Sequence, residues 1–318
     1  MSIALIFPGQ GSQQVGMGRA LADSFAVARA VFEEVDAALG ESLSATIFEG
    51  PEDKLTLTAN AQPALMAVSL ASLRVLEAEA GLDVARHAAF VAGHSLGEYS
   101  ALAAAGSLTV SDAARLLRIR GDAMQKAVPV GEGAMAALLG LDLEAARAVA
   151  AEAAEGDVCQ AANDNAPGQV VVSGAKAAIE RALVIAKSKG AKRAVLLPVS
   201  APFHCALMQP AADVMREALA GVKIVAPKAP LVANVTASPL TDPEDIRKRL
   251  VEQVTGAVRW RESVGFMAGA GVTRFIEIGA GKVLSGLVKR IADGATGEAV
   301  GSPDDIERLK TDGAFGAS

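Results

Sequence analysis

The chain has 318 residues, of which 51% are hydrophobic and 21% are charged, so it can bury a large core and is not intrinsically disordered. Its formal net charge of −6 argues against a nucleic-acid-binding protein, because such proteins usually carry a basic excess. We expect no signal peptide and no membrane span, since no apolar run approaches the roughly 20 residues that a span requires. The two cysteines, Cys159 and Cys205, lack metal-ligand spacing, so we expect a reduced, cytoplasmic protein without a metal site.

Three short apolar segments each lead into a glycine turn and then into an Ala-rich helical stretch. Residues 3–7 precede G-Q-G-S, residues 88–92 precede G-H-S-L-G, and residues 274–278 precede G-A-G-K. Strands that alternate with helices predict an α/β fold in which helices cover a parallel sheet. Reactive groups in such folds gather where strands end and helices begin, which is where all three glycine turns lie.

The middle of the chain has a different element order. We predict strands at 134–139, 158–162, 169–173 and 191–198, and helices at 143–154 and 175–189. This β-α-β-β-α-β order is that of a ferredoxin-like module. We therefore predict an inserted ferredoxin-like subdomain at 131–199 within a large hydrolase-like α/β domain formed by 1–130 and 200–295. The remainder, 296–318, is rich in Gly, Ala and Asp, and we expect a loosely packed tail.

The segment G-H-S-L-G matches the G-x-S-x-G nucleophile elbow and lies between a predicted strand and a predicted helix. A sharp turn would strain the backbone of Ser95, and side chains two residues away on either side would collide, which explains the glycines. The alternative is that the Ser95 hydroxyl only caps the following helix.

A nucleophilic serine needs a base, and the chain has three histidines. Neighbouring side chains at a strand end point to opposite faces, so His94 is poorly placed and is expected to pack behind the turn. His87 is expected in a solvated loop. His204, stiffened by nearby prolines, is the remaining candidate. Its neighbour Cys205 has no helix start or basic group that would lower its pKa, so a thiol mechanism is not favoured.

Six motifs occur in one order: F-P-G-Q-G-S-Q, G-H-S-L-G-E-Y, R-x-R-G-D-A-M-Q, N-x-P-G-Q-V-V-V-S-G, P-V-S-A-P-F-H and E-I-G-A-G-K-V-L. Together they resemble the malonyl-CoA:acyl carrier protein transacylases, which load malonyl groups for fatty acid synthesis. The resemblance extends from residue 3 to about residue 292. It implies transfer through a malonyl-serine intermediate, with malonyl-CoA and phosphopantetheinyl acyl carrier protein as substrates and no cofactor.

The resemblance also assigns catalytic roles. Ser95 matches the nucleophile and His204 its general base, which is oriented by a backbone carbonyl that corresponds here to Gln253. The oxyanion hole corresponds to the backbone N–H groups of Leu96 and Gln10. Donors at helix N-termini suit a developing negative charge, which agrees with this assignment.

Arg120 matches the arginine that binds the free carboxylate of the malonyl group. A guanidinium can hold a carboxylate through two parallel hydrogen bonds, which a lysine cannot do. Arg115 and Arg118 lie on the same predicted helix, and the residue pattern alone does not choose among the three.

Acyl specificity and substrate contact are implied for four further positions. Phe203 and Leu96 resemble the malonyl-selective members, in which a bulky residue crowds a methyl group on the α-carbon. Asn163 and Asn165 match an Asn-rich loop that faces the active site, although a turn-forming role explains them equally well.

Acyl carrier proteins are acidic, so an acidic enzyme needs a local basic surface to bind one. The densest basic cluster of the predicted insertion consists of Lys187, Lys189, Lys192 and Arg193. We expect the carrier to dock there. The alternative is that these residues only form a solvated helix end, where the helix dipole favours positive charge. We expect a monomer that binds neither nucleic acid nor membrane.

Several other features are attributed to structure or chance. The first glycine loop lacks the third glycine of a dinucleotide site and has Gln14 instead. Lys282 is interpreted as a charge beside a helix start, and Glu98 as a favourable charge in a first helical turn. Asn234 begins a glycosylation-like triplet that we attribute to composition.

Two other functions remain open on the residues alone. A serine esterase or thioesterase could use the same Ser95–His204 pair with water as the acceptor. A non-catalytic module could instead hold CoA or a nucleotide through its glycine loops.

Overall fold

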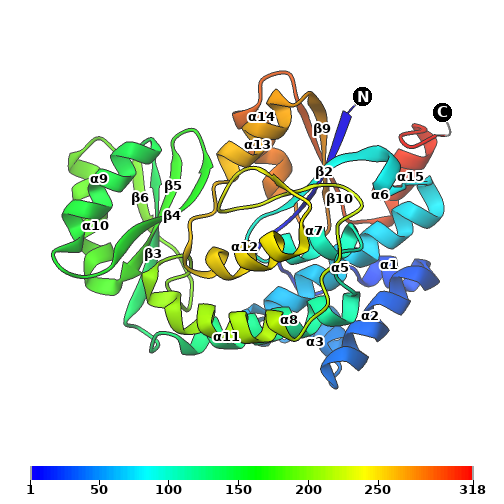
Figure 1. Ribbon diagram of the computed structural model, residues 1–318, viewed down its shortest axis with the longest axis horizontal. Coiled ribbons are helices and arrows are strands. Elements are labelled where there is room, and N and C mark those ends of the chain that lie inside the picture. The colour runs from blue at the N-terminus through cyan, green and yellow to red at the C-terminus, as the bar shows by residue number, and fades with distance from the viewer. Residues whose placement is uncertain (1, 317–318) are drawn as a thin grey trace.

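The computed structural model describes residues 2–316, which form a large lobe and a smaller lobe that projects from one side of it (Figure 1). The large lobe is built on a six-stranded sheet in the order β10-β9-β1-β2-β7-β8. Neighbouring strands are parallel except for β7 and β8. The strands are β1 (Ser2–Phe7), β2 (Ala88–Gly93), β7 (Leu231–Val232), β8 (Pro239–Leu240), β9 (Val272–Ile278) and β10 (Thr296–Val300).

Helices cover both faces of this sheet, as predicted. The helices of the large lobe are α1 (Arg19–Ser24), α2 (Ala26–Leu39), α3 (Leu43–Glu49), α4 (Glu52–Thr56), α5 (Thr58–Ala80), α6 (Val84–His87), α7 (Gly97–Ala104), α8 (Val110–Lys126), the 3-10 turn η1 (Ala206–Met208), α11 (Gln209–Ala220), α12 (Pro243–Thr255), α13 (Trp260–Gly269), α14 (Val283–Ile291) and α15 (Pro303–Thr311). Within the described residues, each helix is too short or too polar to cross a membrane.

Strand β1 shows how the residue pattern produces these layers. Its side chains alternate between the two faces, because successive residues of a strand point in opposite directions. Ile3, Leu5 and Phe7 belong to a core formed with α2, α5, α7 and α8, whereas Ala4 and Ile6 pack with α13 and α14. A strand that is apolar on both faces is typical of a parallel sheet between helical layers.

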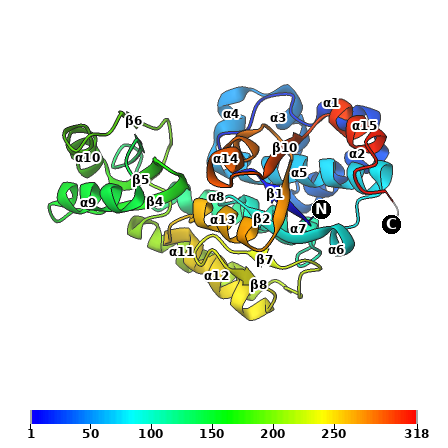
Figure 2. The same ribbon diagram turned by 90° about the horizontal axis from the view of Figure 1, so that it is seen from above.

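The smaller lobe has the predicted element order. It consists of β3 (Gly133–Leu139), α9 (Leu143–Ala154), β4 (Cys159–Ala166), β5 (Gln169–Ala175), α10 (Lys176–Ser188) and β6 (Arg193–Leu196). The antiparallel strand order β4-β5-β3-β6 is that of a ferredoxin-like sheet. Seen from above, α9 and α10 stand clear of the large lobe, and the C-terminus lies at the opposite end of the molecule (Figure 2).

The two lobes share part of one core. Ala134, Ala136 and Leu138 of β3 face α9 and α10, whereas Met135 of the same strand and Val171 of β5 join the core of the large lobe. The small sheet is therefore packed on both faces, and its second face is seated on the domain that carries the elbow.

The loose packing expected after residue 295 is wrong for the described part of this segment. Strand β10 extends the main sheet beside β9, and α15 packs on α5. Ile306, Leu309 and Phe315 are buried, and Ser302 and Asp305 form a capping box at the start of α15. A few apolar residues, together with a capped helix, are enough to pack this segment against the large lobe, although most of its residues are small or polar.

Candidate active site

The turn after β2 has the geometry of a nucleophile elbow. Ser95 has φ of 55°, in the left-handed region that a non-glycine residue rarely adopts. A Cβ at Gly93 would lie 1.9 Å from the carbonyl oxygen of Gly97, and one at Gly97 would lie 2.3 Å from the carbonyl oxygen of Phe7. The predicted strain and the predicted need for both glycines are therefore confirmed.

His204 meets Ser95 across the site. Its Nε2 atom lies 2.8 Å from Ser95 Oγ, and its Nδ1 atom lies 2.9 Å from the backbone oxygen of Gln253 and 3.1 Å from that of Gly256. Because carbonyl oxygens only accept, Nδ1 carries the hydrogen and donates it, which leaves the Nε2 lone pair to accept from the serine hydroxyl. The arrangement orients a base without a carboxylate.

The surroundings of His204 keep its imidazole neutral. The side chain is buried, and burial, together with the nearby positive charge of Arg120, lowers its pKa to about 3. At neutral pH the imidazole is therefore free to accept a proton.

Arg120 places a buried cation beside the nucleophile. Its Nη2 donates to Ser95 Oγ at 3.2 Å and to Gln253 Oε1 at 2.8 Å, and its Nη1 donates to Gln62 Oε1 at 2.7 Å. Arg120 is 1% exposed, and no carboxylate of residues 2–316 forms an ion pair with it. A buried guanidinium held only by neutral groups can accept the carboxylate of a ligand. Arg118, by contrast, pairs with Glu41.

Two backbone N–H groups near Ser95 are free to bind an oxyanion. Leu96 is the N-cap residue of α7, and Gln10 lies in the loop after β1; within the described chain, neither N–H donates a hydrogen bond. This loop packs closely on the elbow, since a Cβ at Gly9 would lie 2.7 Å from the carbonyl oxygen of His94. The location suits the predicted oxyanion hole, which stays a prediction.

Asn234 supports the elbow, a role that the sequence did not indicate. Its side chain is fully buried, its Oδ1 accepts from the Ser95 N–H at 2.8 Å, and its Nδ2 donates to the Gly93 carbonyl at 2.7 Å. No spacing rule connects this residue to the elbow, because the contact depends on β7 lying beside β2. Gln62 of α5, which accepts a hydrogen bond from Arg120, was also missed, because that contact depends on α5 packing against α8.

His94 packs behind the turn, as expected. Its Nε2 lies 2.8 Å from Asn165 Oδ1, and its ring lies near Trp260. The turn-forming alternative for Asn163 and Asn165 is wrong, since both lie within β4, where Asn163 pairs with Val258. A substrate contact for either asparagine stays a prediction.

Three other side chains that the sequence singled out are buried. Phe203 and Leu96 are buried next to the catalytic pair in the chain, and their role in specificity stays a prediction. Cys205 is buried with Sγ 3.1 Å from the Pro202 carbonyl, and burial raises its pKa, so its thiol is not activated. His87 lies at the end of α6 and not in a loop.

The basic cluster lies at the end of α10 and the start of β6. Lys189 forms an ion pair with Glu152, with Nζ 2.7 Å from Oε2. Lys187, Lys192 and Arg193 are exposed and have no ion pair within the described chain. Lys192 also lines a surface hollow of about 470 Å³ together with Arg290 of α14.

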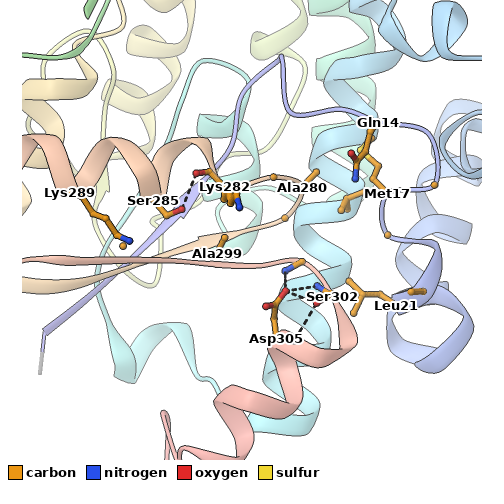
Figure 3. Close-up of a pocket in the computed structure, with 18 residues that line it drawn as sticks. Gln14, Met17, Leu21, Ala280, Lys282, Ser285, Lys289, Ala299, Ser302 and Asp305 are labelled. Atoms are coloured by element: carbon orange, nitrogen blue, oxygen red, sulfur yellow. Dashed lines mark hydrogen bonds between the residues drawn. The ribbon is translucent and has the colours of Figure 1, made fainter. Parts of the chain in front are cut away.

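Gln14, Gly16 and Gly18, which follow the first glycine turn, line a separate cavity of about 650 Å³ together with the third glycine turn (Figure 3). The N-terminus of α14 beside it is already capped, because Glu277 accepts hydrogen bonds from the N–H groups of Leu284 and Ser285. Lys282 was expected beside a helix start, and it is the N-cap residue of this helix. Neither Ser95 nor His204 lines this cavity, so we assign no chemistry to it.

Comparison with known proteins gives one consistent result. The acyl transferase domain family matches residues 4–302. The chain is 48% identical over 306 residues to the malonyl CoA-acyl carrier protein transacylase of Bacillus subtilis, covering 96% of this chain and 95% of the relative. The crystal structure of acyl-carrier-protein-S-malonyltransferase from Bartonella henselae is 57% identical, with a TM-score of 0.96 over 99% of this chain and 100% of that one. A malonyl-transacylase in complex with its type II PKS acyl-carrier protein is 43% identical, with a TM-score of 0.94 over 98% and 100% of the two chains.

Proposed function

The chain belongs to the acyl transferase domain family, and from this premise we propose that it transfers a malonyl group from malonyl-CoA to the phosphopantetheine thiol of acyl carrier protein, supplying fatty acid synthesis. The observation that carries the proposal is the buried guanidinium of Arg120, which lies 3.2 Å from the Ser95 hydroxyl and has no ion pair within residues 2–316. A simple esterase does not need such a cation at its nucleophile. An enzyme whose acyl substrate carries a second, free carboxylate does need one.

In the first half-reaction, His204 takes the proton of the Ser95 hydroxyl as Oγ attacks the thioester carbonyl of malonyl-CoA. The N–H groups of Leu96 and Gln10 stabilise the oxyanion of the tetrahedral intermediate. The C–S bond then breaks, His204 returns the proton to sulfur, and CoA leaves as a thiol. A malonyl ester of Ser95 remains.

In the second half-reaction, His204 deprotonates the phosphopantetheine thiol of the carrier, and the sulfur attacks the serine ester. The C–O bond to Ser95 breaks, and His204 returns the proton to Oγ. Two half-reactions through one covalent intermediate give ping-pong kinetics. The pantetheine arms belong to the substrates, and we propose no metal or redox cofactor.

The choice of acyl group follows from charge and volume. Arg120 is placed to hold the free malonyl carboxylate while the thioester carbonyl lies at Ser95. Phe203 and Leu96 limit the space for a substituent on the α-carbon, which discriminates by only about 1–3 kcal/mol for a methyl group.

We propose that the acidic carrier docks on the basic cluster of Lys187, Lys189, Lys192 and Arg193. Arg290 lies across a shared hollow from Lys192, so the positive surface continues from the smaller lobe onto α14 of the large lobe. Such a surface would steer an acidic partner towards the junction of the lobes. We further propose that the enzyme is cytoplasmic, which suits its two buried, free cysteines, and that it works as a monomer.

The partition of the acyl-enzyme between thiol and water tests transfer against hydrolysis. Enzyme loaded with malonyl-CoA and freed of excess substrate is mixed with carrier protein or with buffer alone, and the serine-bound malonyl group is followed by intact mass. Transfer predicts rapid discharge to the carrier thiol and a long-lived adduct in buffer. Free malonate released at the same rate in both samples would establish the esterase or thioesterase alternative instead.

A further inference from the structure

A second buried ionisable group, the carboxyl group of Glu98, lies in the helix that follows the nucleophile and has no role in the mechanism above. Glu98, in the first turn of α7, is 1% exposed. Its Oε2 accepts a hydrogen bond from Gln253 Nε2, while its Oε1 has no hydrogen-bond partner within residues 2–316. The helix dipole explains an acidic residue at this position on a surface, but it does not explain a buried one with half of its acceptor capacity unused.

One amide connects this carboxyl group to Arg120. The Gln253 side chain donates through Nε2 to Glu98 and to the Ser95 carbonyl oxygen, the latter at 2.9 Å, and it accepts through Oε1 from Arg120 Nη2 at 2.8 Å. A buried cation and a buried acid are thus separated by a single side chain. Since Arg120 has no direct ion pair within the described chain, Glu98 is the acidic group available to balance its charge.

The groups around Glu98 make its protonation sensitive to local charge. Burial raises the pKa of Glu98 to about 7. Hydrogen bonds from Gln253 and the Asn234 backbone, and the positive charge of Arg120, lower this pKa but do not outweigh burial. Arg120 of α8 is the cation that faces it. Tyr99 of its own helix stays protonated because burial raises its pKa, and His204 of the same cluster is neutral because burial lowers its pKa.

We propose that Glu98 is the counter-charge of Arg120 in the free enzyme and takes up a proton from solvent when the malonyl carboxylate binds Arg120. This inference rests on the proposed malonyl transfer. The incoming carboxylate supplies the negative charge that balances the guanidinium, and a second buried carboxylate next to it would then be repelled. Protonated Glu98 is neutral and can still accept from Gln253. An acetyl group carries no charge and leaves Glu98 as it was.

Proton uptake during acylation tests this directly on the wild-type enzyme. Enzyme in weak buffer with a pH-indicator dye is mixed with malonyl-CoA, and the adduct in the same sample is counted by intact mass. We expect uptake of about one proton per malonyl-enzyme near pH 8, falling towards zero near pH 6, where Glu98 is already protonated. Acetyl-CoA, which also releases CoA, provides the blank and should cause no such uptake.

The two proposals fail in different ways. Absence of a malonyl adduct would contradict the proposed function. A stoichiometric malonyl adduct near pH 8 with no proton uptake beyond the acetyl-CoA blank would overturn the role of Glu98 and leave the function standing.

Variants separate this role from structural support. Glu98→Gln keeps an acceptor for Gln253 but cannot take up a proton, so uptake should disappear. In the wild type the KM for malonyl-CoA should rise by up to about tenfold per pH unit above pH 7, and in Glu98→Gln it should be level. Glu277→Gln removes another buried carboxyl group, which caps α14, and should retain the uptake. Uptake or a rising KM that persists in Glu98→Gln would refute the proposal.

Discussion

The Nε2 atom of His204 lies 2.8 Å from the Oγ atom of Ser95, although 109 positions separate the two residues in the chain. Both residues have left-handed backbones, with φ of 59° and 55° respectively. Such conformations cost of order 1–3 kcal/mol each and persist only where the surroundings hold them. Asn234 holds the backbone of Ser95, and the Gln253 carbonyl holds the ring of His204. The fold therefore positions this pair before any substrate binds.

The pH dependence of acetyl transfer tests the environment of His204. Because burial lowers the pKa of His204 to about 3, the acylation rate with acetyl-CoA should stay nearly level from about pH 8 to about pH 5. Stopped-flow measurement of CoA release gives this profile. A rate that falls with an apparent pKa near the ordinary value of 6.5 would contradict a buried, neutral imidazole.

The same shift affects stability. Unfolded His204 takes up a proton below about pH 6.5, whereas the folded residue does not until about pH 3, so its contribution to the free energy of unfolding is lost as the pH falls through this window.

Replacing Arg120 should change the choice of acyl group. In Arg120→Ala, kcat/KM for malonyl-CoA should fall by at least about 100-fold, since losing the partner of a buried charge costs about 3–5 kcal/mol. Transfer of acetyl groups should hold or rise. Arg118→Ala, on the same helix but paired with Glu41, is the matched control and should keep the malonyl preference. An unchanged preference in Arg120→Ala would remove Arg120 from its role.

Removing the amide of Asn234 should weaken both the fold and the elbow. Asn234→Ala leaves the Ser95 N–H and the Gly93 carbonyl without partners, which should lower the free energy of unfolding by about 1–3 kcal/mol. Urea denaturation and the malonylation rate measure the two effects. The control is Thr236→Ala, since the hydroxyl of Thr236 has no hydrogen-bond partner in the described chain. Equal stability of the two variants would show that Asn234 is not a support.

Charge reversal tests the docking surface separately from the chemistry. Lys192→Glu with Arg193→Glu should lower kcat/KM for the carrier protein about tenfold or more at low salt, and the loss should shrink as salt screens the surface. Acylation by malonyl-CoA, measured before any carrier is added, should change little. Lys189→Gln removes a lysine that is already paired with Glu152, and it should lower this kcat/KM less than the double reversal does. Carrier kinetics that do not respond to the double reversal would place docking elsewhere.

Secondary structure could be predicted where local signals agreed with the fold. The helix expected at 143–154 is found at Leu143–Ala154, because Asp142 caps it and an apolar face follows. The strand expected at 158–162 continues to Ala166 instead. N-D-N resembles a turn, but Asn163 and Asp164 pair with β5, and Asn163 also pairs with Val258 of the large lobe. In that segment strand pairing outweighs local preference.

Only those site residues that belong to a sequence motif could be predicted. The elbow sequence and the small number of histidines singled out Ser95 and His204 from the chain alone, whereas Arg120 and Gln253 depended on the resemblance. The roles of Asn234 and Gln62 escaped notice because these are single polar residues whose partners are set by the packing of β7 and α5. The burial of Glu98 was missed because a first-turn acid has an adequate local explanation at the surface.

Peptide mapping of the acyl-enzyme tests the central claim most directly. Enzyme exposed briefly to malonyl-CoA is acid-quenched, its intact mass is measured, and the modified peptide is sequenced by fragmentation. We predict one malonyl group, attached to Ser95, and no adduct in Ser95→Ala. A malonyl group on any other residue, or an adduct of equal yield in Ser95→Ala, would contradict the account.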